Sequence, residues 1–175
     1  MRILEISSMM LALASASSAE AGRQIGTADE HMIATCIHRT SGGHAWLERT
    51  LWGLRDREGG WVGAVIANSN GTYDLGPLQV NSSWVREVAD LTRRSATNVR
   101  WWLIHDACFN VDVARWIFLS DLARTRVYWD AVGAYHSPIN WRRREYAAGV
   151  ASLLVRRFGR DVFRPSLWSR AKPRT

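Results

Sequence analysis

The chain has 175 residues, of which 47% are hydrophobic and 22% are charged. This length and balance are typical of one globular domain with an ordinary core. The formal net charge is +7, and it is concentrated in residues 141–175, which hold ten Arg or Lys residues against two acidic ones. No Gly-rich loop ends in Lys-Ser or Lys-Thr, so the sequence gives no support to nucleotide hydrolysis.

The first 19 residues resemble a secretory signal peptide. Arg2 precedes an apolar stretch at residues 9–14, and small residues lead to an expected cleavage site after Ala19 or Ala21. Glu5 is unusual in such a segment, so an uncleaved amphipathic extension is the alternative. The stretch is too short for a membrane-spanning helix, and the sequence offers no other transmembrane candidate.

The first helical pattern of the domain itself contains Leu47, Leu51 and Leu54 at helical spacing. Gly59 follows, and a glycine in this place commonly ends a helix. The pattern therefore predicts that Glu58 lies in the final turn of a helix. A side chain there can lean from a rigid element into a cleft.

Residues 61–79 hold β-branched residues and turn formers, which predict a loop or a small sheet. Ser82 or Ser83 is then expected to cap a short helix that runs through Val88. Asp106 is expected to cap a later helix, because apolar residues on one face follow it. These residues are Val111, Ala114 and Phe118.

The last predicted helix begins after Ser137, with Pro138 at its first helical position, and ends at Gly159. No internal repeat or second domain boundary is visible. The sequence therefore predicts a single, mainly α domain over residues 30–160, with a small β or loop segment after the first long helix. Residues 161–175 are expected to form a basic, flexible tail.

The segment from Glu58 onward combines one carboxylate with glycines and amides. A glycosidic oxygen is a poor leaving group, so an enzyme that cleaves a sugar–sugar bond must protonate it. A glutamic acid does this at neutral pH only if burial raises its pKa. We expect Trp52, Trp61 and the apolar run 62–66 to provide a dry pocket. Amides suited to sugar hydroxyl and N-acetyl groups follow at Asn68, Asn70, Gln79 and Asn81.

Three motifs together resemble the signature of the lytic transglycosylases. They are Glu58-Gly59, then Gly76-Pro77-Leu78-Gln79-Val80-Asn81, and Ala134-Tyr135-His136-Ser137. Within that superfamily, EGG…NSNGTYDLGPLQVNSSW and DACFN resemble small periplasmic members associated with pili, conjugation and secretion systems. The resemblance covers roughly residues 36–158 and implies a lysozyme-like (goose-type/SLT) fold. Without the downstream motifs, Glu58 would be interpreted as a surface ion-pair residue.

The resemblance also implies roles for individual residues. Glu58 matches the sole catalytic acid/base, while Asn70, Gln79 and Tyr135 match positions that line the sugar subsites. The usual Gly-Leu-Met-Gln is replaced by a run with Pro77, which lacks a backbone donor. The usual Tyr-Asn pair is replaced by one that ends in His136, which we also place near the substrate.

Asp74 is the acid inside the motif that decides between two mechanisms. A lysozyme-type hydrolase would use it to activate water, whereas a lytic transglycosylase needs only Glu58. We interpret Asp74 as a turn-capping or hydrogen-bonding residue of the substrate site. Asn81 is an amide where some goose-type lysozymes carry an aspartate, and we include it among the substrate-binding residues.

The chain has two cysteines, Cys36 and Cys108. In an exported chain an even pair is most simply one disulfide, and the alternative is two separate buried thiols. The five histidines show no zinc-type spacing, so we expect no metal and no cofactor.

The sequence thus predicts a periplasmic lytic transglycosylase that acts on the glycan strands of peptidoglycan, with an envelope-spanning apparatus as a partner. A true lysozyme, a non-catalytic wall-binding protein and a nucleic-acid binder are the alternatives. The basic segment is a solvated helix face and tail, an attractor for anionic cell-wall polymer, or a nucleic-acid contact. A signal peptide argues against the last, so no nucleic acid is expected.

Overall fold

The computed structural model describes residues 26, 27 and 29–163. The expected signal peptide, its cleavage site and residues 164–175 of the expected tail lie outside these ranges. The described chain is a mainly helical single domain with a small three-stranded antiparallel sheet. This confirms the predicted class and the β segment after the first long helix. Within the described residues, no helix is both long enough and apolar enough to cross a membrane.

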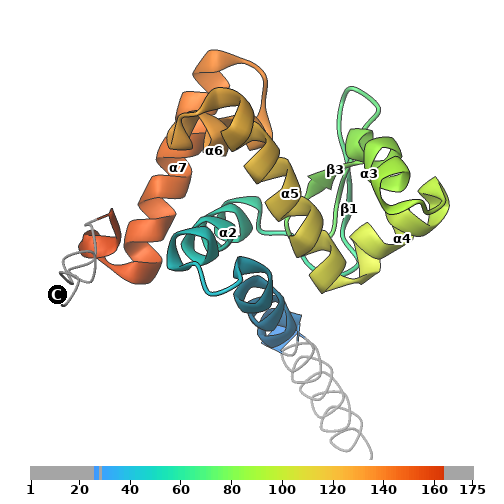
Figure 1. Cartoon of the computed structure of the whole chain (residues 1–175), viewed down its shortest axis with the longest axis horizontal. Coiled ribbons are helices and arrows are strands. Elements are labelled where there is room, and N and C mark those ends of the chain that lie inside the picture. The colour runs from blue at the N-terminus through green and yellow to red at the C-terminus, as the bar shows by residue number, and fades with distance from the viewer. Residues whose placement is uncertain (1–25, 28, 164–175) are drawn as a thin grey trace, which may run out of the picture.

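A first helix occupies residues 29–41, and the other elements follow in chain order (Figure 1). They are α2 (Ala45–Glu58), β1 (Val65–Ala67), β2 (Tyr73–Leu75), β3 (Val80–Asn81), the 3-10 turn η1 (Ser82–Trp84), α3 (Val85–Thr92), α4 (Ala96–His105), α5 (Ala107–Thr125), α6 (Tyr128–His136), α7 (Asn140–Phe158) and η2 (Arg160–Phe163). Helix α5 runs between α6 and α7 on one side and the sheet with α3 and α4 on the other. The sheet region and the α6–α7 pair therefore face each other across α5.

Helix α2 ends where the sequence predicts. Gly59 adopts a left-handed conformation with φ of 62°, and its N–H donates to the carbonyl of Arg55. The leucines of the helical pattern are buried in the core. Glu58 is therefore the last helical residue, and its position is fixed by a helix that is anchored along its buried face.

Helix α7 packs directly on α2 because one residue of α2 has no side chain. A Cβ atom added to Gly53 would lie 2.8 Å from Cγ1 of Val150 and 3.1 Å from Leu154. Farther along, Arg157 donates to both carboxylate oxygens of Asp56 at 2.6 and 2.7 Å. These contacts hold the two helices in register and bring the middle of α7 next to the end of α2.

The sheet forms over the segment that was predicted as a loop or small sheet. Its strands pair in the order β1-β2-β3, with Val65 opposite Leu75 and Asp74 opposite Asn81. The turn between β1 and β2 is closed by a backbone hydrogen bond of 2.8 Å from Asn68 to Thr72. Asp74 and Asn81 consequently lie side by side on neighbouring strands.

The predicted helix cap after the sheet is wrong. Asn81, not Ser82 or Ser83, caps the turn after the sheet, because its side-chain oxygen accepts from the N–H of Ser83 two residues on. The helical segment that follows runs to Thr92, beyond the expected end at Val88.

The start of α7 also differs from the prediction. The helix begins at Asn140 with Ile139 as its N-cap, so Pro138 precedes the helix. The Ser137 hydroxyl accepts from the N–H of Ile139, which makes a local turn instead of a helix cap. The predicted end at Gly159 is confirmed.

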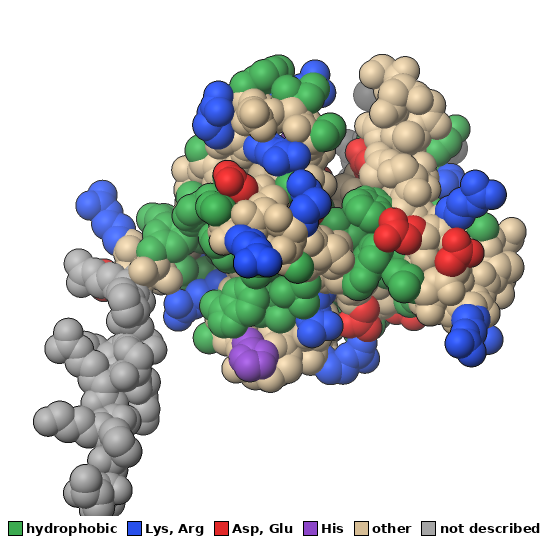
Figure 2. Space-filling view, turned by 45° about the horizontal axis from the view of Figure 1, so that its top comes forward, with side chains coloured by type: hydrophobic (Ala, Val, Ile, Leu, Met, Phe, Trp, Pro, Cys, Tyr) green, Lys and Arg blue, Asp and Glu red, His purple; other side chains and the backbone are tan. Residues whose placement is uncertain are grey.

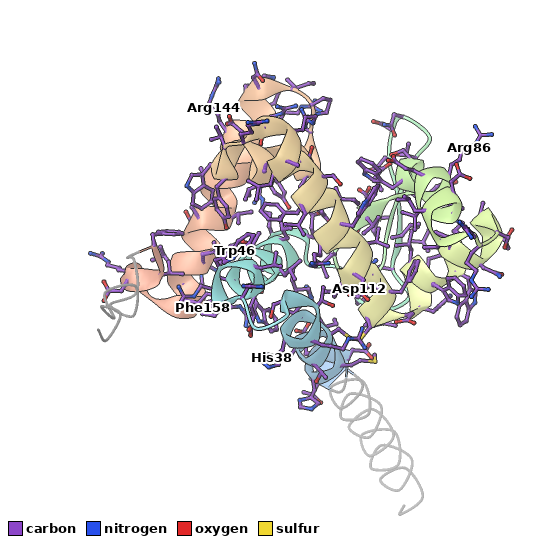
Figure 3. All side chains as sticks on the ribbon, in the orientation of Figure 1. His38, Trp46, Arg86, Asp112, Arg144 and Phe158 are labelled. Atoms are coloured by element: carbon purple, nitrogen blue, oxygen red, sulfur yellow. A yellow bond between two sulfur atoms is a disulfide. The ribbon has the colours of Figure 1, made fainter. Side chains whose placement is uncertain are left out.

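Helix α5 begins as predicted, with the Asp106 side chain accepting from the N–H of Phe109 at 2.9 Å. Val111, Ala114 and Phe118 are fully buried, which confirms the predicted apolar face. The disulfide between Cys36 and Cys108 is also confirmed, and it joins the first helix to the start of α5 (Figure 3).

One buried amide connects α5 to the sheet region. The Asn110 side chain is fully buried and donates to the carbonyl oxygens of Leu75 and Leu103, both at 2.8 Å. Its oxygen accepts from the N–H of Leu78 at 2.9 Å. A Cβ at Gly76, which has φ of 68°, would lie 2.5 Å from this amide. Asn110 therefore satisfies three backbone groups, which lie in β2, in the turn after it and in α4.

We predict that Asn110→Ala lowers the free energy of unfolding by about 3 kcal/mol, because it leaves three buried backbone groups without partners. Chemical denaturation measures this loss. Asn98→Ala, an exposed asparagine on α4, is the matched control and should change stability little. Equal effects of the two substitutions would contradict the structural role of Asn110.

Candidate active site

A cleft of about 740 Å³ opens between the sheet region and the α6–α7 pair. Figure 2 shows a hollow between these two parts of the molecule at the top of the view. The residues that the sequence assigned to catalysis or substrate binding all line this one cleft. They are Glu58, Asn70, Asp74, Gln79, Asn81, Tyr135 and His136. Their contact with a substrate stays a prediction.

Glu58 enters the cleft from the last turn of α2 and is part-buried. The chain behind it packs closely, because a Cβ at Gly60 would lie 2.3 Å from the carbonyl oxygen of Gly76 and 2.7 Å from the Gln79 amide. Only glycine permits this approach. It brings the 76–79 turn against the end of α2, so residues some 20 positions apart share one wall.

Burial raises the pKa of the Glu58 carboxyl to about 7. A hydrogen bond from Tyr146 opposes this shift, the negative charge of Asp74 adds to it, and the positive charge of Arg57 opposes it. A carboxyl with this pKa is protonated in a large share of molecules near neutral pH. It can therefore both donate and accept a proton under the same conditions.

The expected source of this burial is wrong in part. Trp61, Val65 and Ile66 are exposed, with 55%, 42% and 41% of their surface accessible, and they do not line the cleft. The short strand β1 carries the latter two at its exposed edge. Trp52 packs against the core and lies 3.9 Å below the Arg157 guanidinium.

Tyr146 on α7 is the direct partner of Glu58, and the sequence did not identify it. Its buried hydroxyl donates to Oε1 of Glu58, and burial beside that carboxyl raises the pKa of Tyr146 well above its usual value. Tyr146 lies on the buried face of α7. A buried tyrosine hydroxyl needs a polar partner, and that was the available signal.

Tyr135 connects α6 to the 76–79 turn through a hydrogen bond. Its hydroxyl donates to the carbonyl oxygen of Leu78 at 2.9 Å. Burial, followed by the charges of Glu58 and Asp74, raises the pKa of this phenol well above its usual value. Tyr135 therefore stays protonated, and it lines the cleft beside both carboxyls.

A chain of side-chain hydrogen bonds holds the amides of the opposite wall. Asn81 donates to Asp74 at 2.8 Å and to the Thr72 hydroxyl at 2.9 Å. Asn70 accepts from the same hydroxyl and from the N–H of Thr72. Asp74 thus accepts a hydrogen bond within the sheet, and its role at the substrate site stays a prediction.

Gln79 has a strained backbone at the centre of the site. It adopts φ of 48°, a left-handed conformation that is uncommon outside glycine, and its side-chain amide donates to the carbonyl of Gly76 at 2.7 Å. Such conformations concentrate at functional sites. The turn places the Gln79 side chain against the end of α2, next to Glu58.

Four charged residues of α5 and α7 that the sequence analysis did not assign to the site also line the cleft. They are Asp121, Arg124, Arg142 and Arg143. Asp121 and Arg124 form an ion pair, and Arg143 donates to the carbonyl oxygen of Ser137 at 3.0 Å. Trp84 also lines the cleft and packs edge-on against Trp116.

Glu58 forms no salt bridge with any residue that the structure describes, so the default surface ion pair is absent there. Its neighbour Arg55 pairs with Glu30 instead. Among the described residues, no group of three or more His, Cys, Asp or Glu is arranged to hold a metal ion.

Comparison with known proteins gives no further information. No protein-family model matches the chain, and no curated protein matches it significantly. The geometry of the cleft therefore carries the functional argument.

We predict that Glu58→Gln stabilises the protein in a pH-dependent way. The unfolded chain loses the Glu58 proton near its usual pKa of 4.5, whereas the folded chain keeps it up to about 7. Folding of the parent is therefore penalised increasingly from pH 4.5 to 7 and fully above 7. The advantage of Glu58→Gln in unfolding free energy should grow by about 3 kcal/mol between pH 4 and pH 8.

Denaturant unfolding at several pH values measures this difference. Glu87→Gln, which removes an exposed carboxylate from α3, is the matched control. If the advantage of Glu58→Gln were the same at pH 4 and pH 8, the raised pKa of Glu58 would be wrong.

Proposed function

We propose that this protein is a peptidoglycan lytic transglycosylase with a lysozyme-like fold. It cleaves the β-1,4 bond between N-acetylmuramic acid and N-acetylglucosamine and leaves 1,6-anhydro-N-acetylmuramic acid ends. One observation carries the proposal. A part-buried carboxyl with its pKa raised to about 7 lies in the wall of an amide-lined cleft.

The other carboxylates of the cleft favour a mechanism with one acid. Asp121 is paired with Arg124, and Asp74 accepts a hydrogen bond from Asn81. An inverting hydrolase needs a second carboxylate that activates water on the opposite side of the sugar ring. A lytic transglycosylase needs no such group, because Glu58 serves as acid and then as base.

The reaction follows from this single group. Protonated Glu58 donates its proton to the bridging oxygen as the bond from the muramic acid C1 breaks, which releases the 4-hydroxyl of N-acetylglucosamine. The substrate's own N-acetyl oxygen stabilises the positive C1. Ionised Glu58 then takes the proton of the 6-hydroxyl while O6 bonds to C1. The acid is restored, and no water enters the products.

Tyr146 supports both steps. Its hydroxyl donates to the Glu58 carboxyl and stabilises the ionised form that exists between the two proton transfers. It also limits how far burial raises the pKa of Glu58. The acid is thus kept in the range where it gives up and regains a proton with similar ease.

The proposed setting is the periplasm, where the enzyme opens the wall locally for an envelope-spanning apparatus. The disulfide agrees with an oxidising compartment. The proposed partners are glycan strands and components of a secretion, conjugation or pilus system. No cofactor is required by this chemistry.

A lysozyme-type hydrolase is the competing function, because Asp74 lies close enough to Glu58 for its charge to raise the pKa of that residue. Product analysis separates the two. We predict that the purified protein releases muropeptides with 1,6-anhydro ends from sacculi, as measured by mass spectrometry. Glu58→Gln should lower turnover by about three orders of magnitude and retain binding.

Glu48→Gln is the matched control, because it makes the same change on the same helix and Glu48 contacts His38 outside the cleft. Hydrated reducing ends would favour the hydrolase. Equal behaviour of the parent and Glu58→Gln would favour a wall-binding protein without catalysis.

We further predict that kcat/KM falls as the pH rises above about 7, because the first step requires protonated Glu58. Tyr146→Phe removes a hydrogen bond that favours the ionised form, so it should move this decline to higher pH. Tyr73→Phe, on the exposed side of β2, is the matched control and should leave the profile in place. A decline that stays fixed in Tyr146→Phe would contradict the assignment of the titrating group.

A further inference from the structure

A second, smaller pocket of about 230 Å³ adjoins the cleft. It is lined by Arg57, His136, Trp141, Arg142, Glu145 and Tyr146. His136 and Arg142 line both spaces, so the pocket is a side extension of the cleft. The proposed cleavage reaction does not require this pocket.

The pocket is built around the partner of the catalytic acid. The His136 ring stacks on the Tyr146 ring at 4.8 Å with an interplanar angle of 4°. The Arg57 guanidinium lies 5.6 Å from the centre of the same ring. A Cβ at Gly149 would lie 3.2 Å from this guanidinium, so the glycine leaves room for it. The pocket therefore begins at the far side of the Tyr146–Glu58 pair.

The charge of the pocket is positive and its donors are available. No salt bridge joins Arg57 or Arg142 to a carboxylate within the described part of the chain. Arg142 lies over the Trp141 ring at 5.2 Å, and both side chains are exposed. Glu145 is the one carboxylate in the lining. Burial, then Arg57 and Arg142, lower the pKa of His136, which favours a neutral ring.

We propose that this pocket binds a carboxylate of the peptide stem carried by muramic acid, so that the preferred substrate is glycan with its stems in place. The inference rests on the proposed function. A guanidinium binds a carboxylate through two parallel hydrogen bonds, and the pocket offers two guanidinium groups. The pocket volume corresponds to about seven water molecules, and this leaves room for the first residues of a stem.

The position of the pocket fits the covalent structure of the substrate. The stem is attached through the lactyl group on C3 of muramic acid, and the cleaved bond leaves C1 of the same sugar. A stem therefore departs from the glycan within a few bonds of the atom that Glu58 acts on. The pocket adjoins the cleft on the other side of Tyr146, where a stem that leaves the sugar at this point could enter it.

Binding to Glu58→Gln protein tests the inference without turnover. Calorimetry compares three glycan fragments, which carry intact stems, stems with amidated carboxylates, and no stems. We expect the intact stem to improve affinity about tenfold over the other two, which equal each other. Adding Arg142→Gln should remove this advantage. Amidation distinguishes recognition of the carboxylate from recognition of the peptide as such.

Arg144→Gln is the matched control, because it removes the same charge from the same helix. The Arg144 side chain extends from the outer side of α7 and lines neither pocket (Figure 3). If the stem gave no advantage, or if both arginine variants weakened all fragments equally, the subsite would be refuted. Stem-dependent binding by a protein that releases no anhydro products would refute the proposed reaction and leave the subsite in place.

Discussion

The contact between the Tyr146 hydroxyl and the Glu58 carboxyl connects the fold to its chemistry. It joins residues 88 positions apart, and it exists only because α2 and α7 pack closely at Gly53. Burial would by itself hold the proton on Glu58 more tightly, and the hydroxyl moderates that effect. The resulting pKa of about 7 depends on both helices, so the packing of the core sets the chemistry of the cleft.

The wall of the cleft formed by the sheet region depends on close backbone contacts at two glycines, where a side chain would clash. Gly60 lets the 76–79 turn reach the end of α2, and Gly76 lets the same turn pass Asn110. Asn110 in return satisfies three backbone groups of this region. Gly60 and Gly76 therefore allow the sheet region to pack next to Glu58, and the hydrogen bonds of Asn110 stabilise this arrangement.

Local signals in the sequence were sufficient for much of the fold. The end of α2 at Gly59 and the cap of α5 at Asp106 were predicted, because each depends on residues within one turn. The caps at Ser82 or Ser83 and at Ser137 were wrong, since a neighbouring side chain or a local turn provides the hydrogen bond instead. Local competition of this kind is decided by geometry that the sequence does not specify.

Long-range contacts limited the prediction of the site. The motif residues meet in one cleft as expected, but the partner of Glu58 comes from α7, where Tyr146 looks like an ordinary core residue. Likewise, Trp61 is close in sequence and yet exposed. Arg142 was interpreted only as part of the basic segment, because its arrangement with Arg57 around His136 requires α2, α6 and α7 together.

The most direct test is the pKa of Glu58 itself, measured by carbon NMR of labelled side-chain carboxyl groups in the full chain. The Glu58→Gln protein assigns the resonance. A titration midpoint near 7 is predicted from the burial of this group beside Tyr146 and Asp74. A midpoint near the usual value of 4.5 would mean that the carboxyl is solvated, and a neutral proton donor in this cleft would be excluded.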